Sequence, residues 1–208
     1  MLKKNHIKTC LPRNYRTLEI TIDKNKIVIG AMARPGNSYD NNLIRSNIGW
    51  LKNKGYTDII ALDPTPDIAA IAEEFELNYI QKPIEDFTAP SITSLEDIYK
   101  MIEKAIQDPI KKFIIHCREG MGRTGTVIAA LKLKTLILDD PFCKFEEKTE
   151  SISLVQNLEA SCTPTVSKVI HFVREPIHSE QAVETKSQID KLNEYQIYLI
   201  KLKSKKNN

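Results

Sequence analysis

The chain has 208 residues, which suffices for one sizeable hydrophobic core and little more. Hydrophobic residues make up 41% of it and charged residues 27%, as in ordinary soluble domains, and no stretch reaches the roughly 20 apolar residues of a membrane-spanning helix. The basic start MLKKNHIKTCLPRNYR lacks the apolar core of a signal peptide. We therefore expect a cytoplasmic protein without a transmembrane segment, although export by a non-classical route leaves no mark in a sequence.

The charge is unevenly distributed along the chain. Residues 1–16 carry five Lys or Arg and no acid, and residues 201–208 carry four Lys and no acid. Subtracting these nine charges from the net charge of +3 leaves −6 for residues 17–200. We expect the basic ends to be solvated tails, and the alternative is a weak electrostatic contact with nucleic acid or an anionic membrane.

Four cysteines occur, and none of them forms a C-x-x-C pair. They are Cys10, Cys117, Cys143 and Cys162. This spacing argues against a zinc knuckle, and it fits a reducing compartment better than a disulfide framework.

Short apolar or alternating runs separated by helical patterns dominate residues 16–138. Strands are predicted at 16–22, 26–32, 57–63, 78–84 and 111–116. Helices are predicted at 40–54, 64–77, 93–109 and 123–138, the third beginning with a capping box formed by Thr93 and Glu96. This alternation predicts an α/β fold, a single compact domain with a central, mainly parallel sheet flanked by helices.

The region after residue 138 interrupts this alternation. An acidic stretch begins at 139, and we interpret residues 139–162 as a surface insertion with some amphipathic helix. Thr163 and Pro164 are typical of the start of a helix through Val173, and a last helix is predicted from about 180 to 203. The chain is thus divided into a basic N-terminal extension at 1–15, a domain at 16–203 that contains the insertion, and a basic tail at 204–208.

The segment FIIHCREGMGRTGTVIAALKL, residues 113–133, carries the chemistry. Its residues 117–123, here called the cysteine loop, join a strand that ends at Cys117 to a helix that begins near Arg123. Glycines permit a tight turn whose N–H groups point inward, and the helix N-terminus adds a positive dipole, an arrangement that suits a phosphate dianion. The predicted phosphate-binding residues are Arg118, Glu119, Gly120, Met121, Gly122 and Arg123. Arg123 would offer two parallel donors to two phosphate oxygens, which Lys cannot do.

The same field acts on the sulfur of Cys117. Helix N-termini and neighbouring cations lower the pKa of a thiol well below its free value of about 8.5, so we expect a thiolate at neutral pH that attacks phosphorus and forms a phosphocysteine. The hydroxyl of Thr124 would hydrogen-bond this thiolate and make it a better leaving group. His116 would order the loop through its ring nitrogens, and the alternative for it is a buried histidine with satisfied hydrogen bonds.

Phosphoryl transfer also needs an acid for the leaving oxygen. PIEDFTAPSI supplies Glu85 and Asp86 in a proline-flanked loop after a predicted strand. Adjacent residues point in opposite directions in an extended chain, and we favour Asp86 as the acid. The alternative is that both acids are solvated loop residues.

The residues HCREGMGRTG match the H-C-x5-R-S/T signature and resemble the cysteine-dependent protein tyrosine phosphatase superfamily. IVIGAMARPG, PIEDFTAPS and AVETKSQ are similar, in order and spacing, to segments of small atypical dual-specificity phosphatases. The resemblance covers roughly residues 16–138 and 163–200. It implies a compact α/β phosphatase fold with no metal or cofactor, with Cys117 as nucleophile, Arg123 as phosphate binder and Asp86 as general acid and then base.

The motif AVETKSQ aligns with a segment that places the hydrolytic water in tyrosine-specific relatives. The first aligned position of that segment is Glu184 here and glutamine in those relatives. Gln188 is therefore the better candidate for a supporting role. The alternative for both is ordinary polarity on a helix surface.

The interior of the cysteine loop bears on the substrate. Arg118 is basic, Glu119 is acidic and Met121 is neutral, whereas phosphoinositide-selective relatives tend to carry several basic residues there. We therefore favour a phosphorylated protein as substrate. The chain shows no long tyrosine-recognition segment, so phosphoserine and phosphothreonine are expected to be accepted beside phosphotyrosine.

Four other functions are alternatives to this hypothesis. Sulfur transfer of the rhodanese type is disfavoured by the five-residue spacing and by the Arg-Thr pair. RNA 5′-phosphatase activity is allowed by the basic ends and disfavoured by the acidic body. A phosphoinositide phosphatase would use the same loop, and a non-catalytic phosphate-binding module would not need the cysteine, the arginine and the acid together.

Overall fold

The structure of the protein, a computed structural model, describes residues 9–22, 25–36, 40–138 and 163–206. The predicted insertion at 139–162 therefore lies outside the described residues, as do the first eight residues and the last two.

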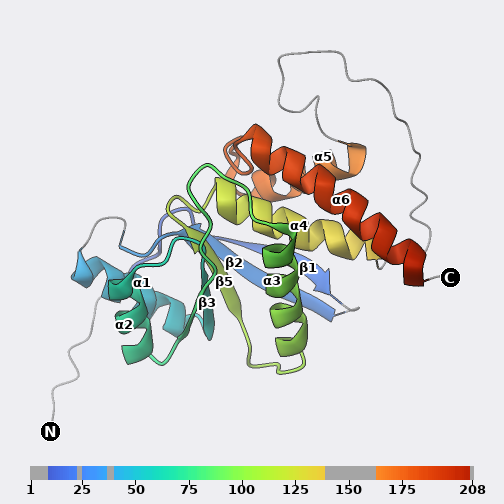
Figure 1. The fold of residues 1–208 in the computed structure, drawn as a ribbon. Helices are drawn as coiled ribbons and strands as arrows, with labels where there is room; N and C mark the ends of the chain where they lie inside the picture. Colours follow the sequence, from blue (N-terminus) through green and yellow to red (C-terminus); the bar gives the residue numbers. More distant parts are fainter. Residues whose placement is uncertain (1–8, 23–24, 37–39, 139–162, 207–208) are drawn as a thin grey trace, which may run out of the picture.

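One sheet of five strands forms the centre of the described chain (Figure 1). Its strands are β1 (Arg16–Ile22), β2 (Asn25–Ala33), β3 (Asp58–Ala61), β4 (Asn78–Gln81) and β5 (Phe113–Cys117). Their order is β1-β2-β5-β3-β4, with β1 antiparallel to β2 and the other neighbours parallel. The prediction of a mainly parallel sheet is confirmed.

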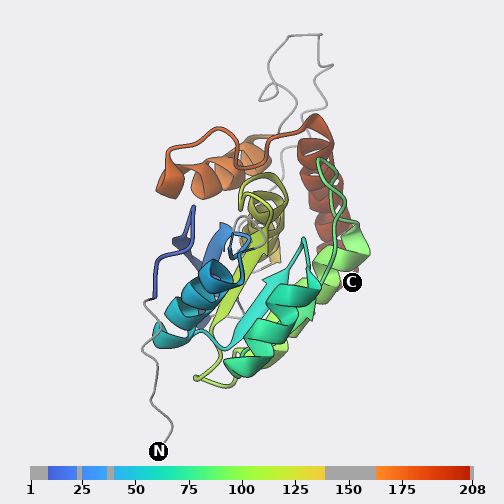
Figure 2. The ribbon, with the colours of Figure 1, turned by 90° about the vertical axis from the view of Figure 1, so that its left-hand side faces the viewer.

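Helices cover both faces of this sheet. Helices α1 (Asn41–Asn53) and α2 (Pro66–Glu74) lie on one face and face the viewer in Figure 2. Helices α3 (Ile92–Ala105), α4 (Gly122–Leu138), α5 (Pro164–Arg174) and α6 (Lys186–Lys206) lie on the other (Figure 1). Because both faces are covered, every residue of β5 is buried, as its continuous apolar run predicts.

Two predicted helix starts are wrong, for local reasons. Helix α3 begins at Ile92 with Ser91 as its N-cap, whose hydroxyl accepts from the Ser94 N–H at 3.1 Å, so Thr93 is not the cap. Helix α6 begins at Lys186 and not near 180, because His178 and Val183 both adopt positive φ, which no helix tolerates. The predicted cap at Thr163 is confirmed by its bond from the Val166 N–H.

Glu96, predicted to complete the capping box, instead belongs to a buried network. Its carboxylate accepts from Lys134 Nζ of α4 at 2.9 and 3.0 Å and from the hydroxyl of Tyr195 of α6. All three side chains are buried. The network joins α3, the C-terminal half of α4 and α6.

The four parallel strands end at one edge of the sheet. Ala33 of β2 pairs with Cys117 of β5, and Ala61 of β3 pairs with both His116 of β5 and Gln81 of β4. The chain segments that leave these strands are thereby brought together, at the edge where open α/β sheets bind ligands.

Candidate active site

The candidate site is built from segments that leave the four parallel strands. Arg34 follows β2, Asp63 follows β3, Asp86 follows β4 after a short loop, and Cys117 is the last residue of β5. The sequence predicted Cys117 and Asp86 as partners, and the structure brings both to this edge.

The cysteine loop curls around the sulfur of Cys117. The side chain is 2% exposed, and its Sγ accepts a hydrogen bond from the Gly120 N–H at 3.2 Å. Gly120 has a φ of +75°, and a Cβ there would lie 2.3 Å from the Met32 carbonyl oxygen. Only glycine meets both demands, so the loop can pass this close to β2 and still aim its N–H at sulfur.

Arg123 lies in the first turn of α4 and is 4% exposed. Its Nη1 donates to the Ile84 carbonyl at 2.8 Å, and its Nη2 lies 2.9 Å from Asp86 Oδ1. Asp63 Oδ1 is a more distant partner at 3.9 Å from Nη1. The guanidinium is thus held at Nη1 by a backbone carbonyl, whereas Nη2 pairs with the half-exposed side chain of Asp86, which a bound anion could replace.

The acid loop, residues 85–88, forms a tight turn. The Thr88 N–H donates to the Glu85 carbonyl at 3.2 Å, and the Phe87 N–H donates to Asp86 Oδ1 at 3.2 Å. Phe87 has a φ of +58° and is 66% exposed, and the side chain of Asp86 is 42% exposed. The turn directs Asp86 toward Arg123, which favours Asp86 over Glu85 as the acid.

His116 and Thr124 are buried beside the loop. His116 Nδ1 lies 3.4 Å from the Cys117 carbonyl oxygen, in keeping with a role in ordering the loop. Burial lowers the pKa of His116 to about 4, despite that backbone contact, so the ring is neutral at physiological pH. The predicted hydrogen bond from Thr124 to sulfur is absent, because the Thr124 hydroxyl and His116 Nε2 have no hydrogen-bond partner among the described residues.

Gln188 connects the turn before α6 to the acid loop. It is fully buried, its Oε1 accepts from the N–H groups of Glu184 and Thr185, and its Nε2 donates to the Thr88 carbonyl at 3.3 Å. Its polar atoms are therefore engaged with backbone. These contacts favour a bracing role for Gln188 over the positioning of a water.

Glu184 lies against the cysteine loop. A Cβ added to Gly122 would lie 2.2 Å from Glu184 Oε1, so the carboxylate rests on the Cα of that glycine. Burial raises the pKa of Glu184, the charge of Asp86 raises it further, and Arg123 opposes both. A larger residue at position 122 would therefore have to displace the carboxylate of Glu184, a contact that the sequence alone does not reveal.

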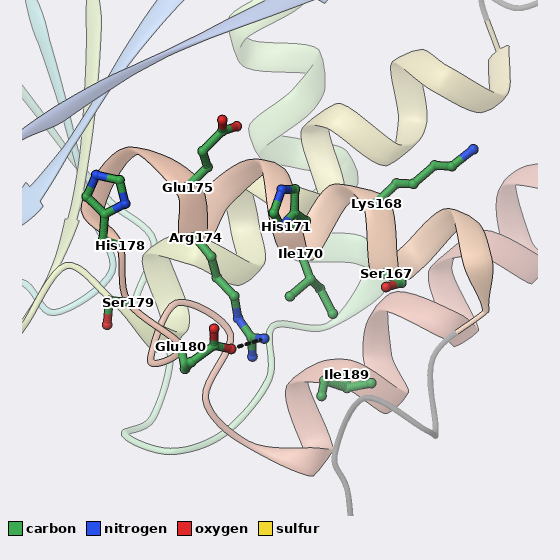
Figure 3. Close-up of a pocket in the computed structure, with 10 residues that line it drawn as sticks. All are labelled: Ser167, Lys168, Ile170, His171, Arg174, Glu175, His178, Ser179, Glu180 and Ile189. Carbon is green, nitrogen blue, oxygen red and sulfur yellow. Dashed lines mark hydrogen bonds and ion pairs between the residues drawn. The ribbon is translucent and has the colours of Figure 1, made fainter.

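Arg174 of α5 holds the segment that carries Glu184. Its Nη1 pairs with Glu180 at 2.6 Å, its Nε donates to the Ala182 carbonyl at 3.0 Å and its Nη2 to the Val183 carbonyl at 3.2 Å. Figure 3 shows the pair with Glu180 at the side of a cavity of about 640 Å³ between α5 and α6. Ala182 and Val183 of this segment also lie against Gly125 of α4.

The predicted loop residues Arg118 and Glu119 are exposed and face the solvent side of the loop. Glu119 pairs with Arg13 at 2.7 Å, and the Arg118 carbonyl accepts from the Arg34 N–H at 3.1 Å. Met121 is half-buried.

Sequence reasoning missed three residues of the site. Arg16 of β1 donates from Nη2 to the Gly120 carbonyl at 2.9 Å, and Arg34 Nη1 lies 3.1 Å from Asp63 Oδ2. Two features of the sequence could have indicated them. Arg16 occupies an inward position of the alternating strand RTLEITI, and Asp63 directly follows the buried run DIIAL.

Two features are absent from the described residues. No group of three or more His, Cys, Asp or Glu side chains there is arranged to hold a metal ion. No helix in the described ranges combines the length and apolarity that crossing a bilayer requires.

Comparisons with known proteins identify phosphatases as similar to this chain. A family model described as "Polymorphic toxin system, DSP-PTPase phosphatase" matches residues 31–136, just over half of the chain, from β2 through most of α4. This range contains the acid loop and the cysteine loop. No curated protein sequence matches significantly.

Solved structures of phosphatases share the fold. Kinase associated phosphatase (KAP), with a serine in place of its catalytic-site cysteine, has a TM-score of 0.65 and 19% identity over 89% of this chain and 96% of its own. A putative protein tyrosine phosphatase from Leishmania major has a TM-score of 0.58 and 14% identity over 88% and 98%. Tk-PTP in its active form has a TM-score of 0.54 and 22% identity over 86% and 96%.

These structures share the fold of this chain. The family model spans both the acid loop and the cysteine loop, and we conclude that the chain belongs to the family described as DSP-PTPase phosphatase of polymorphic toxin systems.

Proposed function

We propose that the protein hydrolyses phosphate monoesters through a phosphocysteine intermediate formed on Cys117. One observation carries the proposal: Cys117 Sγ accepts the Gly120 N–H at the mouth of a loop whose far end presents the buried guanidinium of Arg123. An inward N–H, a helix N-terminus and a guanidinium stabilise both a thiolate and the equatorial oxygens of a transferring phosphoryl group.

The reaction follows in two displacements. The Cys117 thiolate attacks phosphorus, the bond from phosphorus to the ester oxygen breaks, and Asp86 gives its proton to the departing oxygen. Water then attacks the phosphocysteine, Asp86 takes a proton from it, and the S–P bond breaks to release phosphate and the thiolate. Arg123 holds two phosphate oxygens throughout.

We propose a phosphorylated protein as the substrate, with phosphotyrosine accepted and phosphoserine or phosphothreonine accepted beside it. The charges around the loop support this. Glu184, Asp63 and Glu119 lie around the cysteine loop, so a head group with several phosphates would meet acids at its edges. The exposed ring of Phe87, directly after Asp86, offers an apolar surface to the residue that carries the phosphate.

The proposed chemistry also bears on the cellular compartment in which the protein acts. A thiolate nucleophile has to stay reduced, which supports the cytoplasm as the place of action. We also propose that the chain consists of a basic extension at 1–15, a phosphatase domain at 16–203 and a basic tail at 204–208.

Hydrolysis of para-nitrophenyl phosphate tests the chemistry. Cys117→Ser is expected to lower kcat by several orders of magnitude. Cys10→Ser is the matched control, because Cys10 contacts Ser46 and Asn47 of α1 away from the loop, and it should retain activity. Full activity in Cys117→Ser would refute the mechanism, and binding of phosphate without turnover by the unmodified protein would identify a non-catalytic module.

A substrate panel tests the specificity. Phosphotyrosine, phosphoserine and phosphothreonine peptides, phosphoinositides and a triphosphorylated RNA oligonucleotide are compared by kcat/KM at one ionic strength. The proposal expects the phosphopeptides to be the best substrates. A preference for the lipid or for the RNA would replace it by the corresponding alternative.

A further inference from the structure

We propose that Arg16 is a positioning residue that holds the cysteine loop from behind and stabilises the thiolate of Cys117. This inference rests on the proposed function, since it assigns a role toward the same nucleophile. Arg16 is the first residue of β1 and lies more than a hundred positions before Cys117 in the sequence, so no local motif connects the two residues.

Arg16 is a buried cation whose described acceptors are neutral. Its guanidinium is 4% exposed, Nη2 donates to the Gly120 carbonyl at 2.9 Å, and Nη1 donates to the Asn14 carbonyl at 3.2 Å. Its Nε has no partner among the described residues. Burying an arginine on backbone carbonyls alone is costly, so a nearby negative charge is expected to compensate.

The thiolate of Cys117 in the proposed mechanism would supply that charge. Burial lowers the pKa of Arg16 to about 10, and the charge of Cys117 acts in the opposite direction and raises it. Electrostatic coupling between two groups is reciprocal. A cation that the thiolate stabilises therefore stabilises the thiolate by the same free energy.

The hydrogen bonds explain how the loop is oriented. The Asn14 Nδ2 donates to the Glu119 carbonyl at 2.9 Å, and Arg16 donates to the next carbonyl, that of Gly120. In a trans peptide the C=O and the N–H point in opposite directions. Holding both carbonyls from behind therefore directs the N–H groups of Gly120 and Met121 toward the other side, and the first of these already donates to Cys117 Sγ.

The segment 13–16, here called the N-terminal clamp, is shaped for this contact. Asn14 adopts a φ of +55°, which asparagine tolerates better than most residues. The Ala33 N–H donates to the Arg13 carbonyl at 2.9 Å and fixes the clamp to β2. Arg13 also pairs with Glu119, but both side chains are about half exposed, so this pair contributes little.

Several other charged or titratable groups lie on the cysteine loop or at the same edge of the sheet, and the experiment has to separate Arg16 from them. They are Arg34 after β2, Asp63 after β3, Asp86 after β4, His116 of β5, Arg118 and Glu119 of the cysteine loop, Arg123 of α4 and Glu184 before α6. All of them are left unchanged in the variants below, so a difference between variants reports the clamp.

The test compares Arg16→Met, Arg16→Lys and Lys26→Met in the full chain. The rate of Cys117 alkylation by iodoacetamide is followed by mass spectrometry from pH 5 to 9, and kcat/KM for para-nitrophenyl phosphate is measured in parallel. Arg16→Met is expected to slow alkylation at low pH by about tenfold, to move the profile to higher pH and to lower kcat/KM. Arg16→Lys keeps the charge and should keep the alkylation profile but not the full kcat/KM. Lys26→Met removes an exposed cation of β2 that pairs with Glu19 away from the clamp, and it should match the unmodified protein.

A purely structural role would lower the melting temperature without moving the alkylation profile, and that result would overturn the proposal. If Arg16→Met does not fold, Arg16→Lys and Asn14→Ala carry the test. Asn14→Ala releases one carbonyl without exposing a buried charge and should lower kcat/KM several-fold, and unchanged kcat/KM in both variants would also overturn the proposal. Failure of the proposed function is distinguishable, because it would appear as activity retained in Cys117→Ser whatever the clamp variants do.

Discussion

Asp86 Oδ1 lies 2.9 Å from Arg123 Nη2, so the acid of one loop occupies the guanidinium that another loop would offer to phosphate. A phosphate dianion entering the cysteine loop competes with Asp86 for this position, while Nη1 stays on the Ile84 carbonyl. Binding of the substrate would thereby release the Asp86 carboxylate, which has to take up a proton from water before it can protonate the ester oxygen. Phosphate binding and placement of the acid are coupled through one side chain.

Asp86→Asn is expected to have opposite effects on turnover and on product binding. It removes the proton donor, so kcat for phenyl phosphate should fall by about 100-fold or more, and less for para-nitrophenyl phosphate, whose leaving group needs no proton. It also removes the charge that competes for Arg123, so inorganic phosphate should inhibit at lower concentration. Steady-state kinetics with phosphate as inhibitor measures both effects.

Glu85→Gln is the control for this prediction. Its side chain is adjacent in sequence, but the acid loop turns Asp86 and not Glu85 toward Arg123. It should change neither kcat nor inhibition by phosphate. If Glu85→Gln lost turnover and Asp86→Asn kept it, the acid would be assigned to the wrong neighbour.

Gly120→Ala and Gly55→Ala form a second matched pair. Both glycines have φ near +80°, at +75° and +78°, so alanine is strained by about 1 kcal/mol at either site. A Cβ at Gly55 meets nothing within 4 Å, whereas one at Gly120 would lie 2.3 Å from the backbone of Met32. Gly120→Ala should therefore cost more stability and should also lower kcat/KM, since the N–H to Cys117 is displaced.

Chemical denaturation and para-nitrophenyl phosphate turnover distinguish the two glycine variants. Gly55→Ala is expected to lose a little stability and no activity. Equal stability losses and full activity in both variants would show that the cysteine loop tolerates displacement away from β2.

Much of this fold could be predicted because the signals are local. The β1 strand matches its predicted bounds, since RTLEITI alternates and its side chains alternate between buried and exposed positions. The cysteine loop was predictable because the strand, the glycines and the helix start are contiguous in sequence. Thr163 capped its helix as expected, because a cap bonds within three residues.

The remainder depends on contacts between distant segments. Arg16 was counted with a basic end, although it is buried against a loop more than a hundred residues away. Glu96 has the spacing of a capping box, but burial against Lys134 and Tyr195 determines its role. Gln188 looks like surface polarity in sequence and is fully buried, because the acid loop packs over it.

His116 should make the protein sensitive to acid. Burial lowers its pKa to about 4, so between pH 6.5 and 4 the ring is protonated in the unfolded chain and neutral in the folded protein. The free energy of unfolding should fall across this window by up to about 3 kcal/mol on account of this residue. His116→Asn keeps a polar side chain and removes the titration, so urea denaturation at several pH values should give it a flatter profile.

The comparison depends on slopes and not on absolute stability, because His116→Asn also changes packing. His171→Asn on α5, outside the cysteine loop, is the control and should keep the slope of the unmodified protein. Parallel profiles for His116→Asn and the unmodified protein would mean that the ring takes up its proton over the same pH range in the folded and unfolded states.

Glu184→Gln should stabilise the protein at neutral pH. Burial and the charge of Asp86 raise the pKa of Glu184, so folding disfavours its charged form. For an acid with a raised pKa, the favourable contribution is present below the unfolded value of 4.5 and is lost as the pH rises through the folded value. The stability gain of Glu184→Gln should therefore be seen at pH 7 and should disappear below about pH 4.5.

The same substitution removes a negative charge beside the cysteine loop, so KM for a phosphate monoester should fall. Glu180→Gln serves as the control, since Glu180 is an exposed acid on the same segment that pairs with Arg174 away from Gly122. A higher KM in Glu184→Gln would instead point to a direct role of the carboxylate in binding substrate.

Glu96→Ala is expected to be among the most destabilising changes outside the site. It leaves Lys134 buried without its partner and removes the acceptor of the Tyr195 hydroxyl, and breaking a buried ion pair in this way costs about 3–5 kcal/mol. Glu74→Ala removes a comparable two-pronged pair with Arg45 at the surface, and should cost far less because both partners return to water. Chemical denaturation of the two variants measures the free energy of unfolding that each one loses. Similar small losses would mean that α3, α4 and α6 are held together by their apolar contacts alone.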